Sequence, residues 1–404
     1  MSLTPRPAAA LPDETLHKTL VARAEALVPA LLSRVPEARE GRQVPRATID
    51  DMQAAGFFRA LQPKRWGGAE AHPEIFFDVA RTVASACPSS AWVLGVVSVH
   101  SWQLALFPDE AQQEVWGKDS STLISSSYMP VGKVTRTEGG YTLSGEWGFS
   151  SGVDHCDWAM LGAFAPNDDG TPNMQDLRTF LVPKGDFEVK DDWFVSGLQG
   201  TGSKSVVVRE KFVPEHRTHK FGDGFRQKSP GHAENTAPLF KIPFGQMFVR
   251  AVASGGIGML DGALREFVAL QKSRVARSTG GRVAENPMAQ LAVAEAAATL
   301  KELRLVFYDQ LQDMMDYAVS GEKIPLEKRV QWRYETSRVG PKCIAAIDNL
   351  FRAAGGSAIY ETNPLLRYFN DMHAAEAHYV NNPHKPAQNF GAVMLGAANT
   401  DFFI

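Results

Sequence analysis

The sequence predicts an α+β protein in which a helical region, a β-domain and a helical bundle follow one another. Apolar residues recur at three- and four-residue spacing up to about residue 118 and again from residue 244. Between these regions, short β-branched and aromatic runs are separated by turn residues. Because the strands do not alternate with helices, a doubly wound nucleotide-binding fold is disfavoured.

The N-terminal region, residues 1–118, is expected to be helical. Segments such as "ETLHKTLVARAEALVPALLSRV" and "PEIFFDVARTVASAC" carry the helical spacing of apolar residues. The next segment, "PSSAWVLGVVSVHSWQLALF", is apolar except for small polar residues and His100. We therefore expect a buried helix there.

The central region, residues 119–216, predicts a compact β-domain of six to eight strands. Residues 217–243 are rich in Gly, Pro and Ser and predict a long loop that could cover a site. Residues 244–404 predict an up-down four-helix bundle followed by a C-terminal tail.

Composition narrows the class of partner. The net charge of -3 without a long basic run argues against nucleic acid. The N-terminal segment lacks the pattern of a signal peptide, and no stretch of about 18 uninterrupted apolar residues predicts a membrane span. A cytoplasmic protein is expected. The widely spaced cysteines and histidines match no disulfide framework and no metal site.

Several residues could carry chemistry. Serines cluster in "ISSSYMP" and "GFSSGVDH" without a nucleophile elbow, so hydrogen bonding to a ligand and strand-end satisfaction both remain open. "GLQGTGSKS" could bind a phosphate or flavin edge, although spacing alone favours an ordinary turn. His100 is either a satisfied core histidine or a base. His373 and His378 would lie about 140° apart on one helix.

Seven segments together resemble a known family: "LQPKRWGGAEAHPEIFF", "VHSWQLALFPDEAQQEVWG", "ISSSYMP", "GEWGFSSGVDH", "VSGLQGTGSKSVVV", "FVPEHR" and "RYFNDMHAAEAHYVNNP". With the domain order, they resemble the acyl-CoA dehydrogenase superfamily from about residue 15 to 382. This resemblance implies that the β-domain at residues 119–216 is a β-barrel. Within it, the chain looks like the oxygenase components of group D two-component flavin monooxygenases. The likeness is greatest to the 3-HSA 4-hydroxylase type and extends to the p-hydroxyphenylacetate 3-hydroxylase type.

The resemblance implies ortho-hydroxylation of a phenol, a steroid-derived one being a candidate, through a C4a-hydroperoxyflavin. The "YEG" motif that carries the carboxylate base of many acyl-CoA dehydrogenases is absent, and His378 and Tyr379 stand near its place. By motif position, His378 would serve oxygen activation and His100 would meet the phenol oxygen.

The resemblance also implies how cofactor and substrate are held. Ser126, His100 and His373 would contact substrate. The flavin would be bound by a larger set: Ser126, Trp147, Ser150, Ser151, Thr201, Ser203, Lys204, Arg274, Gly355 and Gly356. Which serine of each run faces the flavin remains open. Gly355 and Gly356 lie in "AAGGSAIY", which resembles a loop that reaches a neighbouring subunit's flavin.

The implied cofactor is reduced FMN or FADH2, with O2 as co-substrate. The implied partners are a separate NAD(P)H-dependent flavin reductase, a phenolic small molecule and further copies of the chain in a homotetramer. Other readings remain open: an acyl-CoA dehydrogenase or oxidase, a member of the fold that oxygenates sulfur or nitrogen, and a non-catalytic flavin-binding scaffold.

Overall fold

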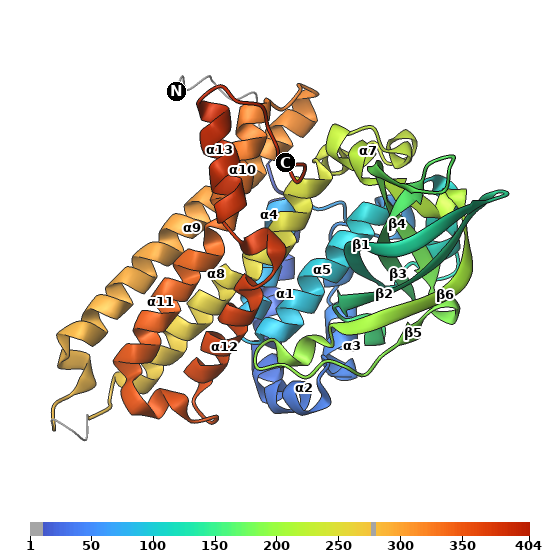
Figure 1. Ribbon diagram of the computed structural model, residues 1–404. Coiled ribbons are helices and arrows are strands. Elements are labelled where there is room, and N and C mark those ends of the chain that lie inside the picture. The colour runs from blue at the N-terminus through green and yellow to red at the C-terminus, as the bar shows by residue number, and fades with distance from the viewer. Residues whose placement is uncertain (1–10, 276–279) are drawn as a thin grey trace.

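A computed structural model describes residues 11–275 and 280–404 of the chain. The N-terminal region is helical, and its last long helix, α5, is buried along all of its 17 residues, as the apolar run predicts. In Figure 1, α5 lies between the helical bundle and the β-domain. The helices of this region are α1 (Glu14–Ser33), α2 (Val35–Gly41), α3 (Arg46–Ala54), α4 (Pro73–Ala84), α5 (Pro88–Leu104) and α6 (Asp109–Trp116).

The β-domain is a seven-stranded sheet with the order β5-β6-β2-β1-β3-β4-β7. Only β1 and β3 pair in parallel, and the register of β1 shifts between Ser127 and Gly132. The predicted barrel is therefore an open sheet whose edge strands are β5 and β7. Its strands are β1 (Ile124–Thr137), β2 (Gly140–Ser150), β3 (Trp158–Pro166), β4 (Pro172–Pro183), β5 (Glu188–Val189), β6 (Lys204–Pro214) and β7 (Thr218–Lys220).

Residues 217–243 are not one long loop, contrary to the sequence prediction. They contain β7, which pairs with β4, and a short helix, α7 (Phe221–Arg226). Two turns of 3₁₀-helix follow, Pro230–Ala233 and Pro238–Lys241. The many Gly and Pro residues separate these short elements, and Phe221 and Phe240 fix them to the core.

The C-terminal bundle consists of α8 (Phe244–Gln271), α9 (Pro287–Ser320), α11 (Val339–Ala354) and α12 (Pro364–Glu376) (Figure 1). A shorter helix, α10 (Leu326–Ser337), precedes α11 with a break at Arg338. The tail contains a further helix that the sequence analysis did not predict, α13 (His384–Met394), which packs on α10. Helix α8 is apolar enough to cross a membrane, yet 89% of its apolar window is buried inside the protein, as in a core helix.

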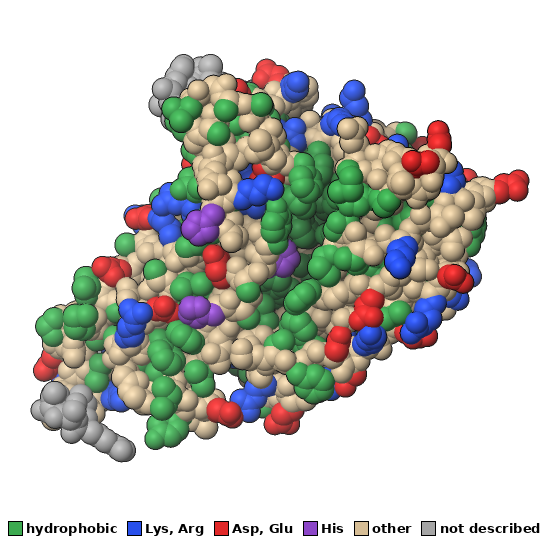
Figure 2. Space-filling view, in the orientation of Figure 1, with side chains coloured by type: hydrophobic (Ala, Val, Ile, Leu, Met, Phe, Trp, Pro, Cys, Tyr) green, Lys and Arg blue, Asp and Glu red, His purple; other side chains and the backbone are tan. Residues whose placement is uncertain are grey.

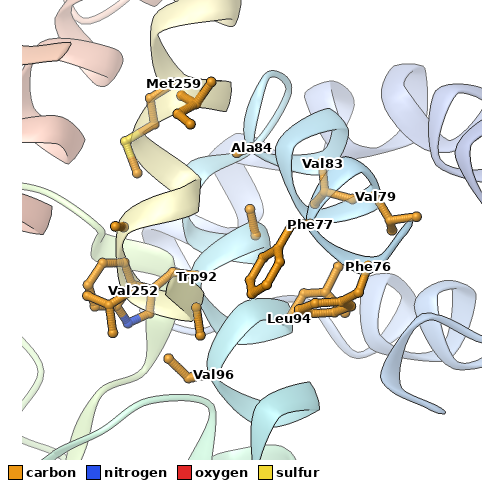
Figure 3. Packing of buried hydrophobic residues seen from close by; sticks show 14 of the residues in the cluster. Phe76, Phe77, Val79, Val83, Ala84, Trp92, Leu94, Val96, Val252 and Met259 are labelled. Atoms are coloured by element: carbon orange, nitrogen blue, oxygen red, sulfur yellow. The ribbon is translucent and has the colours of Figure 1, made fainter. Parts of the chain in front are cut away.

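The main core joins α4, α5 and α8. Figure 3 shows Phe76 and Phe77 of α4 facing α5, while Trp92 of α5 lies beside Val252 of α8. Helices α5 and α8 pack closely at Gly95, where an added Cβ would stand 3.0 Å from the Ala251 carbonyl oxygen. Helix α5 therefore packs against α8, and it also contacts β1 of the sheet.

Candidate active site

His100 lies on α5 and is 1% exposed. Its Nδ1 is 2.6 Å from the Ile124 carbonyl oxygen, and its Nε2 is 2.7 Å from Ser126 Oγ. Because a carbonyl oxygen only accepts, Nδ1 carries the proton and Ser126 donates to Nε2. Burial lowers the pKa of His100 to about 4. At neutral pH the ring is uncharged and Nε2 is a hydrogen-bond acceptor.

His378 follows α12 rather than lying on it, because the helix ends at Glu376. The helical angle expected between His373 and His378 therefore does not apply. His378 caps a 3₁₀ turn, Tyr379–Asn381, and its Nδ1 accepts the Val380 N–H at 3.3 Å. Burial, with a smaller effect of Arg333, lowers the pKa of His378 to about 4. Nδ1 is an acceptor, so Nε2 carries the proton as a neutral donor.

Aromatic rings connect the two histidines. The ring of Trp92 stands 5.8 Å from that of His378 and the ring of Phe248 6.3 Å from it, centroid to centroid. Tyr128 lies 5.1 Å from Phe248 and 6.1 Å from His100. Figure 2 shows a hollow lined by hydrophobic side chains between the bundle and the β-domain. The sequence analysis missed Trp92, Tyr128 and Phe248, because apolar runs give no sign of which rings line a site.

The structure distinguishes the serines of each run. Ser126 bonds His100, and Ser151 accepts the Trp92 indole N–H at 3.0 Å. Ser150 instead donates to Ser125 at 3.1 Å, and both are fully buried away from these rings. Ser126 and Ser151 are thus the serines beside the histidines. Ser150, expected at the flavin, lies within the sheet.

The segment "GLQGTGSKS" is bound to the sheet by its own side chains. Ser203 Oγ lies 2.7 Å from Ser151 Oγ and 2.7 Å from Thr201 Oγ1. Lys204 forms ion pairs with Asp154 at 3.0 Å and Asp191 at 3.5 Å. Thr201, Ser203 and Lys204, which were expected to bind the flavin, therefore already have protein partners.

Trp147 lies in the core of the β-domain, where its indole N–H donates to the Gly162 carbonyl oxygen at 2.9 Å. The expectation that it packs on the flavin is not supported, since alternation along β2 turns it into the sheet core. Phe149, two residues later, is 66% exposed and has a φ of 62°. A non-glycine residue in this conformation is strained, and such strain concentrates at functional sites.

His373, expected to contact substrate, is outside the cluster in this chain. It lies on α12, half exposed, with Nε2 3.1 Å from Asp348 Oδ1 of α11. Glu376, the last residue of α12, also faces α11, because a Cβ added at Gly340 would clash with its carboxylate. Neither side chain joins the aromatic hollow.

Arg274, Gly355 and Gly356 come together at one end of the bundle. Arg274 Nη1 donates to the Ala354 carbonyl oxygen at 2.8 Å, directly before the two glycines. Gly355 has a φ of 66°, in the region that favours glycine. This end of the bundle is separate from the histidine cluster in the same chain.

Comparisons with known proteins agree with this architecture. The acyl-CoA dehydrogenase N-terminal domain matches residues 15–120, and the acyl-CoA dehydrogenase C-terminal domain matches residues 251–383. The solved structure of 3-HSA hydroxylase from Rhodococcus sp. RHA1 superposes with a TM-score of 0.92 at 37% identity, covering 96% of this chain and 100% of that one. The fold and the site define an enzyme of the acyl-CoA dehydrogenase superfamily.

Sequence relatives define the family. A flavin-dependent monooxygenase, oxygenase subunit HsaA, from Rhodococcus jostii is 38% identical over 95% of this chain and 100% of its own length. An FADH(2)-dependent resorcinol hydroxylase, oxygenase component, from Rhizobium sp. is 33% identical over 98% of both chains. The chain belongs to the oxygenase components of the flavin-dependent monooxygenases, as the sequence motifs predict.

Histidines whose pKa is lowered in the folded protein make stability depend on pH; His100 and His378 are two of them, and burial also lowers the pKa of His72 to about 4 and of His219 to about 3. We expect the free energy of unfolding to fall as pH drops from 6.5 to 4. In this range the unfolded chain takes up protons at histidine, while His100 and His378 stay neutral in the folded protein. Each pKa difference amounts to roughly 3 kcal/mol. Asp371, whose pKa burial raises to about 6, acts in the opposite direction below pH 6.

Urea titrations at several pH values measure this slope. His100→Asn should make the slope less steep than in the unchanged chain, because one of the histidines with a lowered pKa is then absent, while His72, His219 and His378 remain. An equal slope in both proteins would show that His100 is not held neutral by burial.

Proposed function

We propose that this protein hydroxylates a phenol at the ring carbon ortho to its hydroxyl, using O2 and reduced FMN or FADH2. A separate NAD(P)H-dependent reductase would supply the reduced flavin, and the cytoplasm is the proposed compartment. One observation carries the proposal. A neutral acceptor, His100 Nε2, and a neutral donor, His378 Nε2–H, lie at the two ends of one cluster of aromatic rings, joined through Tyr128 and Phe248.

His100 would bind the phenol oxygen. Its Nε2 now accepts from Ser126, and a phenolic O–H could take the place of that donor. With a pKa of about 4, His100 is too weak a base to ionise the phenol before the reaction. During hydroxylation the phenol ring gains positive character, and its O–H becomes a strong acid. His100 Nε2 then accepts the phenol proton, while the Ser126 hydroxyl donates a hydrogen bond to the phenol oxygen.

His378 would supply a hydrogen bond or proton on the opposite side of the hollow. Its Nδ1 is engaged by the Val380 N–H, so the ring cannot rotate without losing that bond. Trp92 and Phe248 pack beside it and exclude water, which strengthens polar interactions inside the site.

Several residues fit the flavin. When bound, reduced flavin supplies the electrons that activate O2. The exposed ring of Phe149 offers a stacking surface next to Ser151, whose hydroxyl can bond a ring heteroatom. We place Arg274, Gly355 and Gly356 at the flavin of a neighbouring subunit, because they lie together apart from this chain's histidines. We propose that the sites are shared between subunits of a homotetramer.

Replacing Arg274 by Leu should weaken flavin binding about tenfold, the effect of losing one charge-assisted contact. The nearby exposed Arg282, which pairs with Glu285, provides the control Arg282→Ala. Mixing His378→Asn subunits with Arg274→Leu subunits should restore part of the hydroxylation, since some sites then combine two intact halves. Absence of any restoration would contradict a shared site.

The function is tested with purified protein, a generic flavin reductase, NADH, FMN and a panel of phenols that includes bicyclic steroid-derived ones. We expect a catechol product that carries one oxygen atom from ¹⁸O2. Bleaching of bound flavin by an acyl-CoA without O2 would instead show a dehydrogenase. Oxygen found on sulfur or nitrogen rather than the ring would overturn the phenol assignment.

A further inference from the structure

Four hydrogen bonds form a continuous chain from Trp92 to the Leu198 carbonyl. The indole N–H of Trp92 donates to Ser151, and Ser203 lies between Ser151 and Thr201 at 2.7 Å from each. Thr201 Oγ1 is 3.0 Å from the Leu198 carbonyl oxygen. All three hydroxyl residues are buried, so bulk water does not interrupt the chain.

The two ends fix the direction of every proton in this chain. The Leu198 carbonyl can only accept, so Thr201 donates to it. Because the Thr201 proton is used in this bond, Ser203 must donate its proton to Thr201 Oγ1. Ser151 must in turn donate its proton to Ser203 Oγ. The Trp92 N–H can only donate, which agrees with this order. The hydroxyl of Ser151 therefore points its proton into the protein.

The carbonyl end is held in place. Leu198 has a φ of 52°, an uncommon conformation for leucine. Its N–H donates to Asp371 of α12 at 2.6 Å, and its carbonyl also accepts the Trp193 indole N–H at 3.2 Å. These contacts orient the carbonyl toward Thr201.

A hydroxyl has one proton and two lone pairs. Ser151 gives its proton to Ser203 and uses one lone pair for Trp92, which leaves one lone pair. Reduced flavin carries a proton on N5, whereas N5 of oxidised flavin is a bare acceptor. An acceptor-only Ser151 thus matches the reduced form.

We propose that the hydroxyl chain of Ser151, Ser203 and Thr201 makes the site select reduced over oxidised flavin by presenting Ser151 as an acceptor. The inference rests on the proposed function, in which Ser151 meets the flavin ring. Ser203 and Thr201 are positioning residues that act through Ser151. They lie in the "GLQGTGSKS" segment that the sequence suggested for phosphate binding.

The test compares the Kd of dithionite-reduced FMN, measured anaerobically, with that of oxidised FMN. The unchanged protein should bind reduced FMN more tightly. Ser203→Ala leaves the Ser151 proton without its acceptor and free to donate to N5 of oxidised FMN. The preference should fall about fivefold, the effect of one neutral hydrogen bond. The midpoint potential of bound FMN should drop by about 20 mV.

Thr201→Val breaks the same chain at its next link with a side chain of similar shape, and it should lower the preference by a similar factor. Ser203→Thr keeps a hydroxyl and should restore the preference. Ser205→Ala, two residues further along the chain in β6 and at a more exposed position, is the matched control. An unchanged preference in both Ser203→Ala and Thr201→Val, or an equal loss of affinity for both redox forms, overturns the proposal. Failure of the unchanged protein to bind either form would instead overturn the proposed function, and the inference with it.

Discussion

His100→Asn is expected to reduce phenol hydroxylation by about 10²- to 10⁴-fold, the usual loss on removing a general base. Consumption of reduced flavin and O2 should continue, with hydrogen peroxide as the product. Hydroxylation is lost without loss of O2 consumption because the two histidines lie in different places. His100 lies beside Ser126 and Tyr128, whereas His378 lies beside Trp92 and Phe248.

Asparagine is chosen because its side-chain amide can keep the hydrogen bond that Nδ1 makes to the Ile124 carbonyl. The fully buried position then loses only the Nε2 acceptor and part of the ring volume. Ser126→Ala should cost less, since it removes a hydrogen bond to the phenol but not the proton acceptor.

The acidity of the substrate provides an internal control. A phenol with an electron-withdrawing substituent is already ionised near neutral pH and does not need His100 as a base. His100→Asn should therefore impair its hydroxylation much less than that of an unsubstituted phenol. An equal loss for phenols of different acidity would exclude proton acceptance by His100. Product and peroxide are measured in the same reaction.

Periodicity was sufficient to predict the order of the regions and the burial of α5. A helix with every face apolar, such as "PSSAWVLGVVSVHSWQLALF", has few alternatives to the core. The predictions of secondary structure were wrong where tertiary contacts determine whether a helix forms or where it ends. Helix α12 ends two residues before His378, and α7 forms within the Gly- and Pro-rich segment because Phe221 is buried there.

Some residues of the candidate site could be predicted from the sequence, and others could not because tertiary contacts place them. His100 was noticed as an imidazole within an apolar run, and His378 by its position where the YEG motif is absent, while Trp92 and Phe248 resembled ordinary core residues. Trp147 was assigned to the flavin although the alternation of β2 turns it inward. Adjacent serines such as Ser150 and Ser151 cannot be ranked from sequence, because a bulge between Trp147 and Ser150 sets which one faces the histidines.

His378→Asn is expected to reduce coupled hydroxylation by at least about 10²-fold while the Kd for reduced FMN changes by less than about threefold. Asparagine is a good capping residue, so its side chain can accept the Val380 N–H in place of Nδ1. The substitution thus keeps the turn that follows α12 and removes the Nε2–H donor.

Because burial and Arg333 keep the pKa of His378 near 4, the ring stays neutral throughout the pH range in which the enzyme would be assayed. Its titration should therefore produce no loss of hydroxylation between pH 6 and 8, and the variant should be equally impaired across that range. His373→Asn is the matched control, since that ring lies on α12 beside Asp348 and outside the hollow. Comparable losses of hydroxylation in the two variants, or a His378→Asn defect that appears only in FMN binding, would remove His378 from the chemistry and leave it a structural cap.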